Sequence, residues 1–490
     1  MKMLLQLIVT IITVIVCSCS SGRSISIRTS DTPPRAIPAS QFHTRIDSVL
    51  NDSVLSTCFI GVKIVSLDDG KTLYEQNSNK LFHPASNMKL LTTATGLKEL
   101  GGDFRFVTNL LANARVRNGV LDGDLSVKAS GDPLIRTEDL DSLAVAVSNS
   151  GITRITGDLI GDVSYFDSVA WGRGWMWDDE PDADEAFISP LTINDNALTI
   201  LVQPGKAAGE PARVKLNPFT KYLRVINSGI TSGDTMIPPL SVTRHQGENT
   251  ILVRGRIAPH ASAQEFMLSV YQPAMYFLTL LKETLIEHGI TVEGRTRLDS
   301  ARGNSTIATL SHSLDSVVFR INKASDNIAA ENLLKTIAAE HGGIPGTTHN
   351  GLIIMKEYLA SLGIDTTAMI LEDGSGVSFY NLISPSAIVR LLQNQYADER
   401  NYGRFHESLP VAGVDGTLMN RMRGTRAEGN VHAKTGTLTG ASGLSGYIRT
   451  LDGKRLAFSM LCNHFPSKVK ALREAQDRVM EILANTTVTE

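Results

Sequence analysis

The spacing of hydrophobic and polar residues divides this chain into two kinds of segment. Towards both ends, apolar residues recur at helical spacing, as in residues 41–56 and 469–484, and short strand-like runs lie between such segments. Between about residues 101 and 314 the pattern changes to short alternating runs broken by Gly, Asp and Asn, which predicts strands and turns. We therefore expect a largely β insertion that interrupts a domain built from both ends of the chain.

The individual elements follow from the same patterns. A hairpin is expected from residues 59–65 and 71–75 around Asp68-Asp69-Gly70, and a helix over residues 84–100 that ends at Gly101. Further helices are predicted at residues 137–148, 272–289, 325–340, 352–362, 386–395 and 469–484. Further strands are predicted at residues 105–116, 119–130, 152–163, 197–203, 213–216, 222–227, 250–257, 429–439, 441–450 and 455–463.

The N-terminus has the pattern of an export signal. Lys2 precedes a mostly apolar run over residues 4–16, which is too short to span a bilayer and typical of a cleavable signal. The following Cys17-Ser18-Cys19 resembles a bacterial lipoprotein signal with Cys19 as the lipidated residue, although a cysteine two positions earlier is unusual, so lipidation stays open. Residues 20–40 are polar and proline-containing and predict a linker. We expect the mature protein to work outside the cytoplasm.

Composition removes several classes of function. Lys and Arg number 47 against 50 Asp and Glu, a formal net charge of −3, so no basic surface indicates a nucleic-acid partner. The expected folded part has no His-Glu-x-x-His or Cys-x-x-Cys pattern and no phosphate-binding glycine-rich loop, so neither a metal nor a cofactor is expected. Cys58 and Cys462 are either two buried free thiols or, if their strands pair antiparallel, a disulfide.

Ser86 and Lys89 are the first candidates for catalysis. They stand at positions i and i+3 at the start of an expected helix, so both side chains leave the same helical face. A serine hydroxyl is a poor nucleophile unless a neighbouring base removes its proton, and an amine can be that base only where burial or a nearby cation keeps it uncharged. Because a Ser-x-x-Lys spacing also occurs by chance, this pair needs partners elsewhere in the chain.

Two later segments can supply those partners. Ser325 and Asn327 stand at the start of another expected helix, where Ser325 could also be an ordinary helix N-cap. The stretch Lys434-Thr435-Gly436-Thr437 lies on an expected strand. A glycine on a strand lets another backbone come close, which a peptide substrate that pairs with a sheet edge would require.

Taken in order, Ser86-x-x-Lys89, Ser325-x-Asn327 and Lys434-Thr435-Gly436 resemble the motif set of penicillin-binding proteins and class A β-lactamases. The long separation between Lys89 and Ser325 exceeds the spacing in compact β-lactamases. The chain is most similar to the type-4 (class C) low-molecular-mass penicillin-binding proteins, which are D-alanyl-D-alanine carboxypeptidases and endopeptidases. The resemblance covers about residues 41–464 and includes residues 130–133, 155–158, 174–179, 373–376 and 410–417.

The resemblance implies a role for each residue of the first two motifs. Ser86 would be the nucleophile that becomes acylated, and Lys89 would be the base that takes its proton. Ser325 would pass a proton towards the leaving amine. Asn327 would hold both the substrate amide and Lys89.

The resemblance also implies roles for the strand motif. Lys434 would lower the pKa of Lys89 by like-charge repulsion and attract the terminal carboxylate of the substrate. Thr435 and Thr437 would donate hydrogen bonds to that carboxylate beside Gly436. The backbone N–H groups of Ser86 and Thr437 would form the oxyanion hole.

Two features bear on the distal end of the substrate. Phe379 stands where the family usually has arginine, which leaves the side-chain specificity open. The three tryptophans in residues 171–177 lie beside Asp178 and Asp179. These tryptophans either pack domains together or line the cleft, with Asp178 or Asp179 near a substrate ammonium group.

The fold implied by the resemblance is of the α/β class. A β-lactamase/transpeptidase-like α/β/α domain with a five-stranded antiparallel sheet would be interrupted by two β-rich domains. The expected divisions are a signal peptide at residues 1–19, a linker at 20–40, the peptidase domain at 41–100 and 315–490, inserted domain II at 101–128 and 200–314, and inserted domain III at 129–199.

The implied function is that of a periplasmic serine D-alanyl-D-alanine carboxypeptidase. It would act on peptidoglycan stem peptides through an acyl-serine, with D,D-endopeptidase activity left open, and it would bind penicillin and other β-lactam antibiotics covalently. A β-lactamase is disfavoured because no Glu-x-x-x-Asn segment follows at the compact spacing. A non-catalytic wall-binding or β-lactam-sensing protein is disfavoured because Ser86, Lys89 and Lys434 are all present.

Overall fold

The computed structural model of the chain describes residues 36–466 and 469–488. The expected export signal, including Cys19, lies outside the described residues. Most of the expected linker, residues 20–35, also lies outside the described residues, whereas Ile37 belongs to a short strand and a helix begins at Ala39. Within the described ranges, no helix combines the length and the apolar character needed to cross a membrane.

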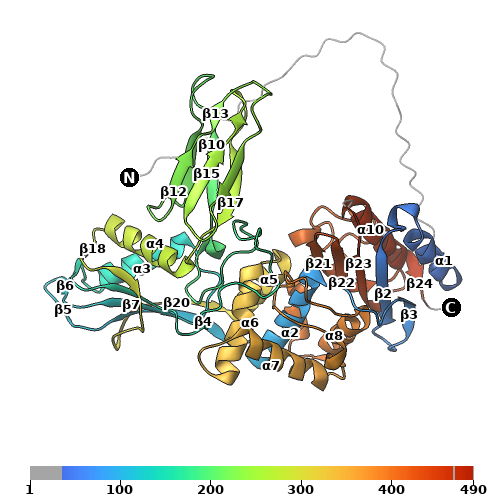
Figure 1. Cartoon of the computed structure of the whole chain (residues 1–490). Helices are drawn as coiled ribbons and strands as arrows, with labels where there is room; N and C mark the ends of the chain where they lie inside the picture. The colour runs from blue at the N-terminus through green and yellow to red at the C-terminus, as the bar shows by residue number, and fades with distance from the viewer. Residues whose placement is uncertain (1–35, 467–468, 489–490) are drawn as a thin grey trace, which may run out of the picture. The chain divides into compact units, whose positions relative to one another are not determined.

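A five-stranded antiparallel sheet lies at the centre of the domain formed by the two ends of the chain (Figure 1). Its strands are β2 (Phe59–Ser66), β3 (Thr72–Gln76), β21 (His432–Leu438), β22 (Ala441–Arg449) and β23 (Arg455–Asn463). Their order is β21-β22-β23-β2-β3, and every neighbouring pair is antiparallel. Strand number and direction both confirm the expected fold. The edge position of β21 leaves one side of that strand without a neighbour in the sheet.

Helices cover both faces of this sheet and give the expected α/β/α layers. These helices are α1 (Ala39–Leu50), α2 (Met88–Glu99), α5 (Leu314–Lys323), α6 (Asn327–Gly342), α7 (Thr348–Ser361), α8 (Pro385–Ala397), α9 (Tyr402–Ser408) and α10 (Val469–Asn485), with the short 3₁₀ helices η1 (Ser53–Leu55), η2 (Ala85–Asn87), η4 (Thr366–Ala368) and η5 (Gly416–Leu418). Helices α1 and α10 share a core with one face, whereas α2 and α5 to α9 share a core with the other. Most residues of α2 and α6 are buried because other elements surround these helices.

The alternation of side chains along β2 shows how the two cores are separated. Ile60, Val62 and Ile64 point into the core with α1 and α10. Val65, the next residue along the strand, points the other way and belongs to the opposite core. The pairing of β2 with β3 also shifts its register between Ile64 and Val65. The two ends of the chain also meet in a short parallel pair between β1 (Ile37–Pro38) and β24 (Thr486–Thr487).

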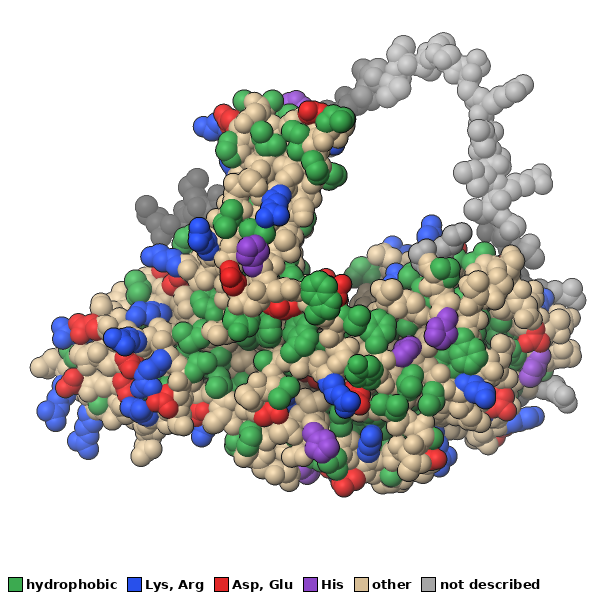
Figure 2. Space-filling model, in the orientation of Figure 1, with side chains coloured by type: hydrophobic (Ala, Val, Ile, Leu, Met, Phe, Trp, Pro, Cys, Tyr) green, Lys and Arg blue, Asp and Glu red, His purple; other side chains and the backbone are tan. Residues whose placement is uncertain are grey.

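The insertion between α2 and α5 is largely β, as expected. It comprises β4 (Arg105–Ala112), β5 (Val116–Arg117), β6 (Val120–Leu121), β7 (Leu125–Ala129), α3 (Thr137–Asn149), β8 (Arg154–Ile155), β9 (Leu159–Asp162), η3 (Asn194–Asn196), β10 (Ala197–Gln203), β11 (Arg213–Asn217), β12 (Arg224–Asn227), β13 (Ile230–Thr231), β14 (Ser241–Arg244), β15 (Thr250–Arg254), β16 (Arg256–Ile257), β17 (Gln264–Ser269), α4 (Pro273–Glu287), β18 (Thr291–Val292), β19 (Thr296–Leu298) and β20 (Ser305–Ser313). On the face shown in Figure 2, charged side chains of both signs are interspersed, in line with the nearly balanced composition.

Strand pairing groups the insertion differently from the expected boundaries. Strand β9 falls in the expected domain III, at residues 129–199, yet it pairs with β7 and β19 of the expected domain II. A single hydrophobic core also joins Leu140 and Leu159 to Leu110 and Phe277. Two separate three-stranded sheets, β11-β10-β17 and β12-β15-β14, use residues 197–269. The boundary expected near residue 129 therefore does not separate sheets, because local sequence pattern predicts a strand but not its partner.

Of the two alternatives for Cys58 and Cys462, the structure has free thiols and not a disulfide. Strands β2 and β23 pair antiparallel, with Cys462 opposite Ile60, and Cys58 immediately precedes β2. Both cysteines are nevertheless free thiols. Cys462 is fully buried, whereas Cys58 is only partly buried. Burial raises the pKa of both thiols.

Candidate active site

Ser86 lies in η2, one turn before Lys89 in the first turn of α2. The preceding Ala85 has a left-handed backbone, with φ of 47°, a conformation that costs about 1 kcal/mol or more for a non-glycine residue. A neighbouring loop holds this turn: a side-chain carbon at Gly376 would lie 2.0 Å from the carbonyl oxygen of Ala85. The serine is therefore presented by a constrained turn, as is common at sites where strain positions a reactive group.

Lys89 is fully buried and directed at Ser86. Its Nζ lies 3.0 Å from Ser86 Oγ, 2.5 Å from Asn327 Oδ1 and 2.7 Å from the carbonyl oxygen of Ser375. Burial lowers the pKa of Lys89 to about 8, although Asp373 and other nearby carboxylates oppose this by favouring the charged amine. An appreciable fraction of Lys89 is therefore uncharged near neutral pH, and its lone pair can accept the proton of the serine hydroxyl.

Ser325 lies at the junction of α5 and α6 with a left-handed backbone, φ 64°. It is not the N-cap of α6, the alternative that the sequence offered, because Asp326 caps this helix by accepting a hydrogen bond of 2.9 Å from Ala329 N. Ser325 Oγ instead accepts a hydrogen bond of 2.8 Å from Lys434 Nζ. Asn327 begins α6, and its Nδ2 donates a hydrogen bond to the carbonyl oxygen of Asp184 at 2.8 Å.

Lys434 is a second fully buried amine, on β21. Besides Ser325 Oγ, its Nζ contacts the carbonyl oxygen of Thr435 at 2.9 Å. Burial lowers the pKa of Lys434 well below its ordinary value, and the positive charge of Lys89 lowers it further. The sequence analysis expected the reverse influence, in which the charge of Lys434 lowers the pKa of Lys89. For Lys89 itself, burial is the main cause of the lowered pKa.

Gly436 brings β21 against the turn that carries the nucleophile. A side-chain carbon at this position would lie 2.7 Å from Asn87 Nδ2, 2.9 Å from the Pro84 carbonyl oxygen and 3.0 Å from Ser86 N. Only glycine therefore fits without moving the strand or the turn. On either side of it, Thr435 Oγ1 donates a hydrogen bond to Thr417 Oγ1 at 2.7 Å, and Thr437 Oγ1 accepts one from Arg473 Nη2 at 3.2 Å.

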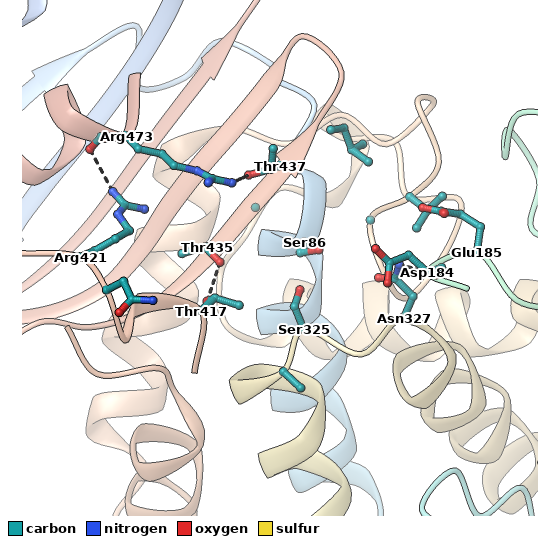
Figure 3. A pocket seen from close by; sticks show the side chains of 16 residues that line it. Ser86, Asp184, Glu185, Ser325, Asn327, Thr417, Arg421, Thr435, Thr437 and Arg473 are labelled. Carbon is teal, nitrogen blue, oxygen red and sulfur yellow. Dashed lines mark hydrogen bonds between the residues drawn. The ribbon is translucent and has the colours of Figure 1, made fainter. Parts of the chain in front are cut away.

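These motifs meet at one cavity of about 640 Å³ (Figure 3). Two acidic residues lie at one end of it and two arginines lie at the other, beyond the strand that carries Thr437 (Figure 3). The amines of Lys89 and Lys434 lie beneath hydroxyl groups that line the cavity. In the described part of the chain, His, Cys, Asp and Glu side chains form no group of three or more that could hold a metal ion. The residues that line the cavity include Ser86, Asp184, Glu185, Ser325, Asn327, Thr417, Arg421, Thr435, Gly436, Thr437 and Arg473.

The acidic residues of the cavity are not those that the sequence indicated. Asp178 and Asp179 are not among the lining residues, and Asp179 Oδ2 instead accepts a hydrogen bond from Met176 N at 3.1 Å. Asp184 and Glu185 take that place, and burial together with neighbouring carboxylates raises the pKa of Glu185 to about 8. A run of acidic residues from position 178 to 185 was the only signal in the sequence, and it does not indicate which of them reaches the cavity.

The tryptophans have separate environments. Trp175 is buried, and its Nε1 donates a hydrogen bond of 3.0 Å to Asp373 Oδ2, so it packs the insertion onto the loop that lies against the nucleophile turn. Trp171 packs edge-on against Trp175, whereas Trp177 is 75% exposed. Packing rather than a cleft lining therefore describes Trp171 and Trp175.

Glu331 of α6, a buried carboxylate that the sequence analysis did not single out, holds the loop at residues 373–376. Glu331 Oε1 accepts hydrogen bonds from Gly374 N at 2.9 Å and Ser375 N at 2.7 Å. Burial and the nearby charge of Asp373 raise the pKa of Glu331 to about 7. Through this loop, Glu331 positions the Ser375 carbonyl that receives a hydrogen bond from Lys89.

Ion pairs connect the insertion to the junction that carries Ser325. Arg320 donates to Asp326 Oδ2 through Nε and to Asp195 Oδ2 through Nη2, both at 2.8 Å. Asp195, from η3 of the insertion, also accepts a hydrogen bond from Arg136 Nη2 at 2.8 Å. Because Asp326 stands between Ser325 and Asn327, this chain of charges helps to fix two candidate catalytic residues.

Several known proteins are similar to this chain in sequence, and a solved structure is similar to it in fold. The sequence profile of the D-Ala-D-Ala carboxypeptidase 3 (S13) family matches residues 42–486. The D-alanyl-D-alanine carboxypeptidase of Actinomadura sp. (strain R39) is 38% identical over 434 residues, which cover 85% of this chain and 80% of that protein. The D-alanyl-D-alanine carboxypeptidase DacB of Haemophilus influenzae is 29% identical over 415 residues, which cover 83% of this chain and 85% of that protein.

The crystal structure of penicillin binding protein 4 (dacB) from Haemophilus influenzae has the same fold, with a TM-score of 0.81 and 25% identity over 90% of this chain and 99% of that one. The resemblance inferred from the three motifs is thereby confirmed. With a family match that spans nearly the whole described chain, this protein belongs to the D-Ala-D-Ala carboxypeptidase 3 (S13) family of serine peptidases.

Proposed function

We propose that this protein hydrolyses peptides that end in D-Ala-D-Ala, as a serine carboxypeptidase that forms an acyl-enzyme on Ser86. One observation carries the proposal: a buried amine whose pKa is lowered to about 8 lies 3.0 Å from a serine hydroxyl at the wall of a cavity. Such an amine can act as a general base near neutral pH, and the serine it faces can act as a nucleophile.

The acylation step follows from these contacts. Lys89 takes the hydroxyl proton while Ser86 Oγ attacks the carbonyl carbon of the penultimate residue. The backbone N–H groups of Ser86 and Thr437, both in residues that line the cavity, stabilise the negative charge on the carbonyl oxygen. Ser325 then gives its proton to the nitrogen of the departing D-alanine and is reprotonated from Lys434, with which it shares a hydrogen bond. Water releases the acyl group by the same route in reverse.

The outer edge of β21 from Lys434 onwards supports an extended peptide as the substrate; at the start of the strand, Val411 bridges His432 and Ala433 N donates to the Pro410 carbonyl. An edge strand offers backbone groups for pairing, and Gly436 keeps the approach narrow beside Ser86. With the peptide paired in this way, Thr435 and Thr437 lie beside its terminal carboxylate. Asn327, which contacts Lys89 and the Asp184 carbonyl, holds the substrate amide.

Peptidoglycan stem peptides are the substrates that we propose. Asp184 and Glu185 lie at one end of the cavity, where an ammonium group on the distal part of such a peptide would favour the charged form of Glu185, whose pKa is otherwise raised to about 8. Phe379 packs edge-on against His83 and is not among the residues that line the cavity. D,D-Endopeptidase activity on cross-linked peptides would use the same catalytic residues.

Covalent β-lactam binding at Ser86 belongs to the same proposal. The Haemophilus influenzae penicillin binding protein 4, 25% identical with a TM-score of 0.75, has been solved complexed with a novel β-lactam. We also propose a periplasmic location for the mature protein, with residues 1–19 as the export signal, on the basis of the sequence pattern.

The experiment combines hydrolysis with identification of the acylated residue. The wild-type protein should release D-alanine from a peptide that ends in D-Ala-D-Ala, Ser86→Ala should not, and the exposed Ser361→Ala should match the wild type. Mass spectrometry of penicillin-treated protein should place the added mass on the peptide that contains Ser86. Label on another residue would contradict the proposal. Rapid turnover of penicillin would favour a β-lactamase, and acylation without peptide hydrolysis would favour a β-lactam sensor.

A further inference from the structure

A permanent positive charge at the end of the cavity that would receive the substrate carboxylate would favour binding of that carboxylate. Lys434 is fully buried, its amine contacts Ser325 and the Thr435 carbonyl, and its pKa is lowered well below the ordinary value. A buried amine with these partners loses its proton more easily than an exposed lysine does. Lys434 is therefore poorly suited to be the only cation facing a carboxylate.

Arg473 of α10 is placed to provide that charge. Its Nη2 donates a hydrogen bond to Thr437 Oγ1 at 3.2 Å, and its side chain lines the same cavity as Ser86 and Thr435 (Figure 3). A guanidinium group stays charged at all relevant pH values and presents several donors in a planar fork that matches a carboxylate.

The neighbouring charges compensate that of Arg473 only in part. Arg421, the other arginine of the cavity, pairs with Asp477 at 2.6 Å and donates to Gln476 Oε1 and the Arg473 carbonyl at 3.1 Å. No carboxylate oxygen lies within ion-pair distance of the Arg473 side chain among residues 36–466 and 469–488. Partial burial and repulsion from Arg421 lower the pKa of Arg473, and the charge of Asp477 opposes this. This end of the cavity thus carries excess positive charge that favours an anion.

We infer that Arg473 is a specificity-determining residue that binds the free carboxylate of the leaving residue together with Thr435 and Thr437. The inference rests on the proposed peptidase function and extends it. The carboxylate would be the group on the carbon attached to the scissile nitrogen. Substrates with this carboxylate are favoured over the corresponding amides, and the preference depends on a residue outside the three sequence motifs.

The test compares two substrates that differ only in this group. One peptide ends in D-Ala-D-Ala with a free carboxylate, and the other ends in the carboxamide. Arg473→Gln should lower kcat/KM for the acid about tenfold, mainly through KM, and leave kcat/KM for the amide unchanged. Lys470→Gln, one turn earlier on α10 and outside the cavity, removes the same charge and should change neither value.

Two further measurements separate this inference from the proposed function. In a Ser86→Ala background, calorimetry should show tighter binding of the acid than of the amide, and Arg473→Gln should abolish the difference, whether or not turnover occurs. Increasing salt should weaken the acid preference of the wild type more than that of Arg473→Gln. Equal loss for acid and amide, or an undiminished acid preference in both assays, would overturn the inference. Absence of Ser86-dependent hydrolysis would overturn the proposed function, while the binding comparison would still decide the role of Arg473.

Discussion

Raising the pH from about 6 to about 9 should accelerate acylation of Ser86, because Lys89 can accept a proton only as the uncharged amine. The pKa of Lys89 is lowered to about 8. Below that value kcat/KM should rise about tenfold per pH unit, and above it the profile should level off. At pH 7 about one molecule in ten has the uncharged amine, compared with about one in three thousand for an ordinary lysine, so burial increases the available base roughly three-hundredfold.

The assay is the pH dependence of two reactions of the same serine. Both kcat/KM for a D-Ala-D-Ala peptide and the acylation rate with benzylpenicillin should show the limb near pH 8. Lys89→Gln should remove most of the activity together with the limb. Glu185 also has a pKa of about 8, so Glu185→Gln identifies the titrating group: the limb should remain in this variant. A flat profile between pH 6 and 9, or a limb that disappears with Glu185, would refute the assignment of Lys89 as the base.

The same shift in pKa has a consequence for stability. An unfolded lysine keeps its proton up to about pH 10.5, whereas folded Lys89 loses it near pH 8, so between these values the unfolded state binds more protons. The free energy of unfolding should therefore rise with pH in this window. Below pH 8, the burial of protonated Lys89 lowers the free energy of unfolding by its full amount, on the order of 3 kcal/mol. Urea denaturation at several pH values should show a smaller rise for Lys89→Gln than for the wild type.

Three substitutions test the supporting structure. Gly436→Ala should lower kcat/KM at least about tenfold and cost about 1–3 kcal/mol of stability, because the added carbon must push β21 away from Ser86 N; wild-type kinetics would contradict the close approach. Arg320→Met should cost about 1–2 kcal/mol in urea denaturation and lower kcat several-fold, since Asp326 and Asp195 lose their shared partner; a loss of stability without any change in kcat would show that this link does not position Ser325. Asp373→Asn should cost about 2–4 kcal/mol and move the limb of the pH profile below 8, because the negative charge that favours protonated Lys89 is removed; an upward movement of the limb would contradict this electrostatic role.

Much of the peptidase domain is visible in the sequence because its signals are local. The alternation along β2 and the apolar stripes of α1 and α10 follow from burial on one face of an element, and each motif lies at the start of a helix or on a strand. Helices α5 and α9 and the long strand β20 were missed. Strand β20, at Ser305–Ser313, consists mostly of small polar residues and has no fully apolar face.

The remaining features depend on contacts between distant residues. No local pattern connects β9 with β7 and β19, since any exposed strand edge could accept it. The acidic run does not distinguish Asp184 from Asp178, because the choice depends on how a loop of the insertion meets Asn327. Arg473 lies on a helix without a motif, and only the packing of α10 against the sheet brings it to Thr437.

The discontinuity of the peptidase domain sets the order in which its parts can be completed during synthesis. Strand β2 pairs with β23, which is made almost at the end of the chain, so the N-terminal hairpin has no central neighbour until translation is nearly finished. The sheets of the insertion use only residues 105–313 and can close much earlier. Ser86 and Lys89 are thus among the first residues made, yet they meet Lys434 among the last, and a truncated chain carries the nucleophile without its catalytic surroundings.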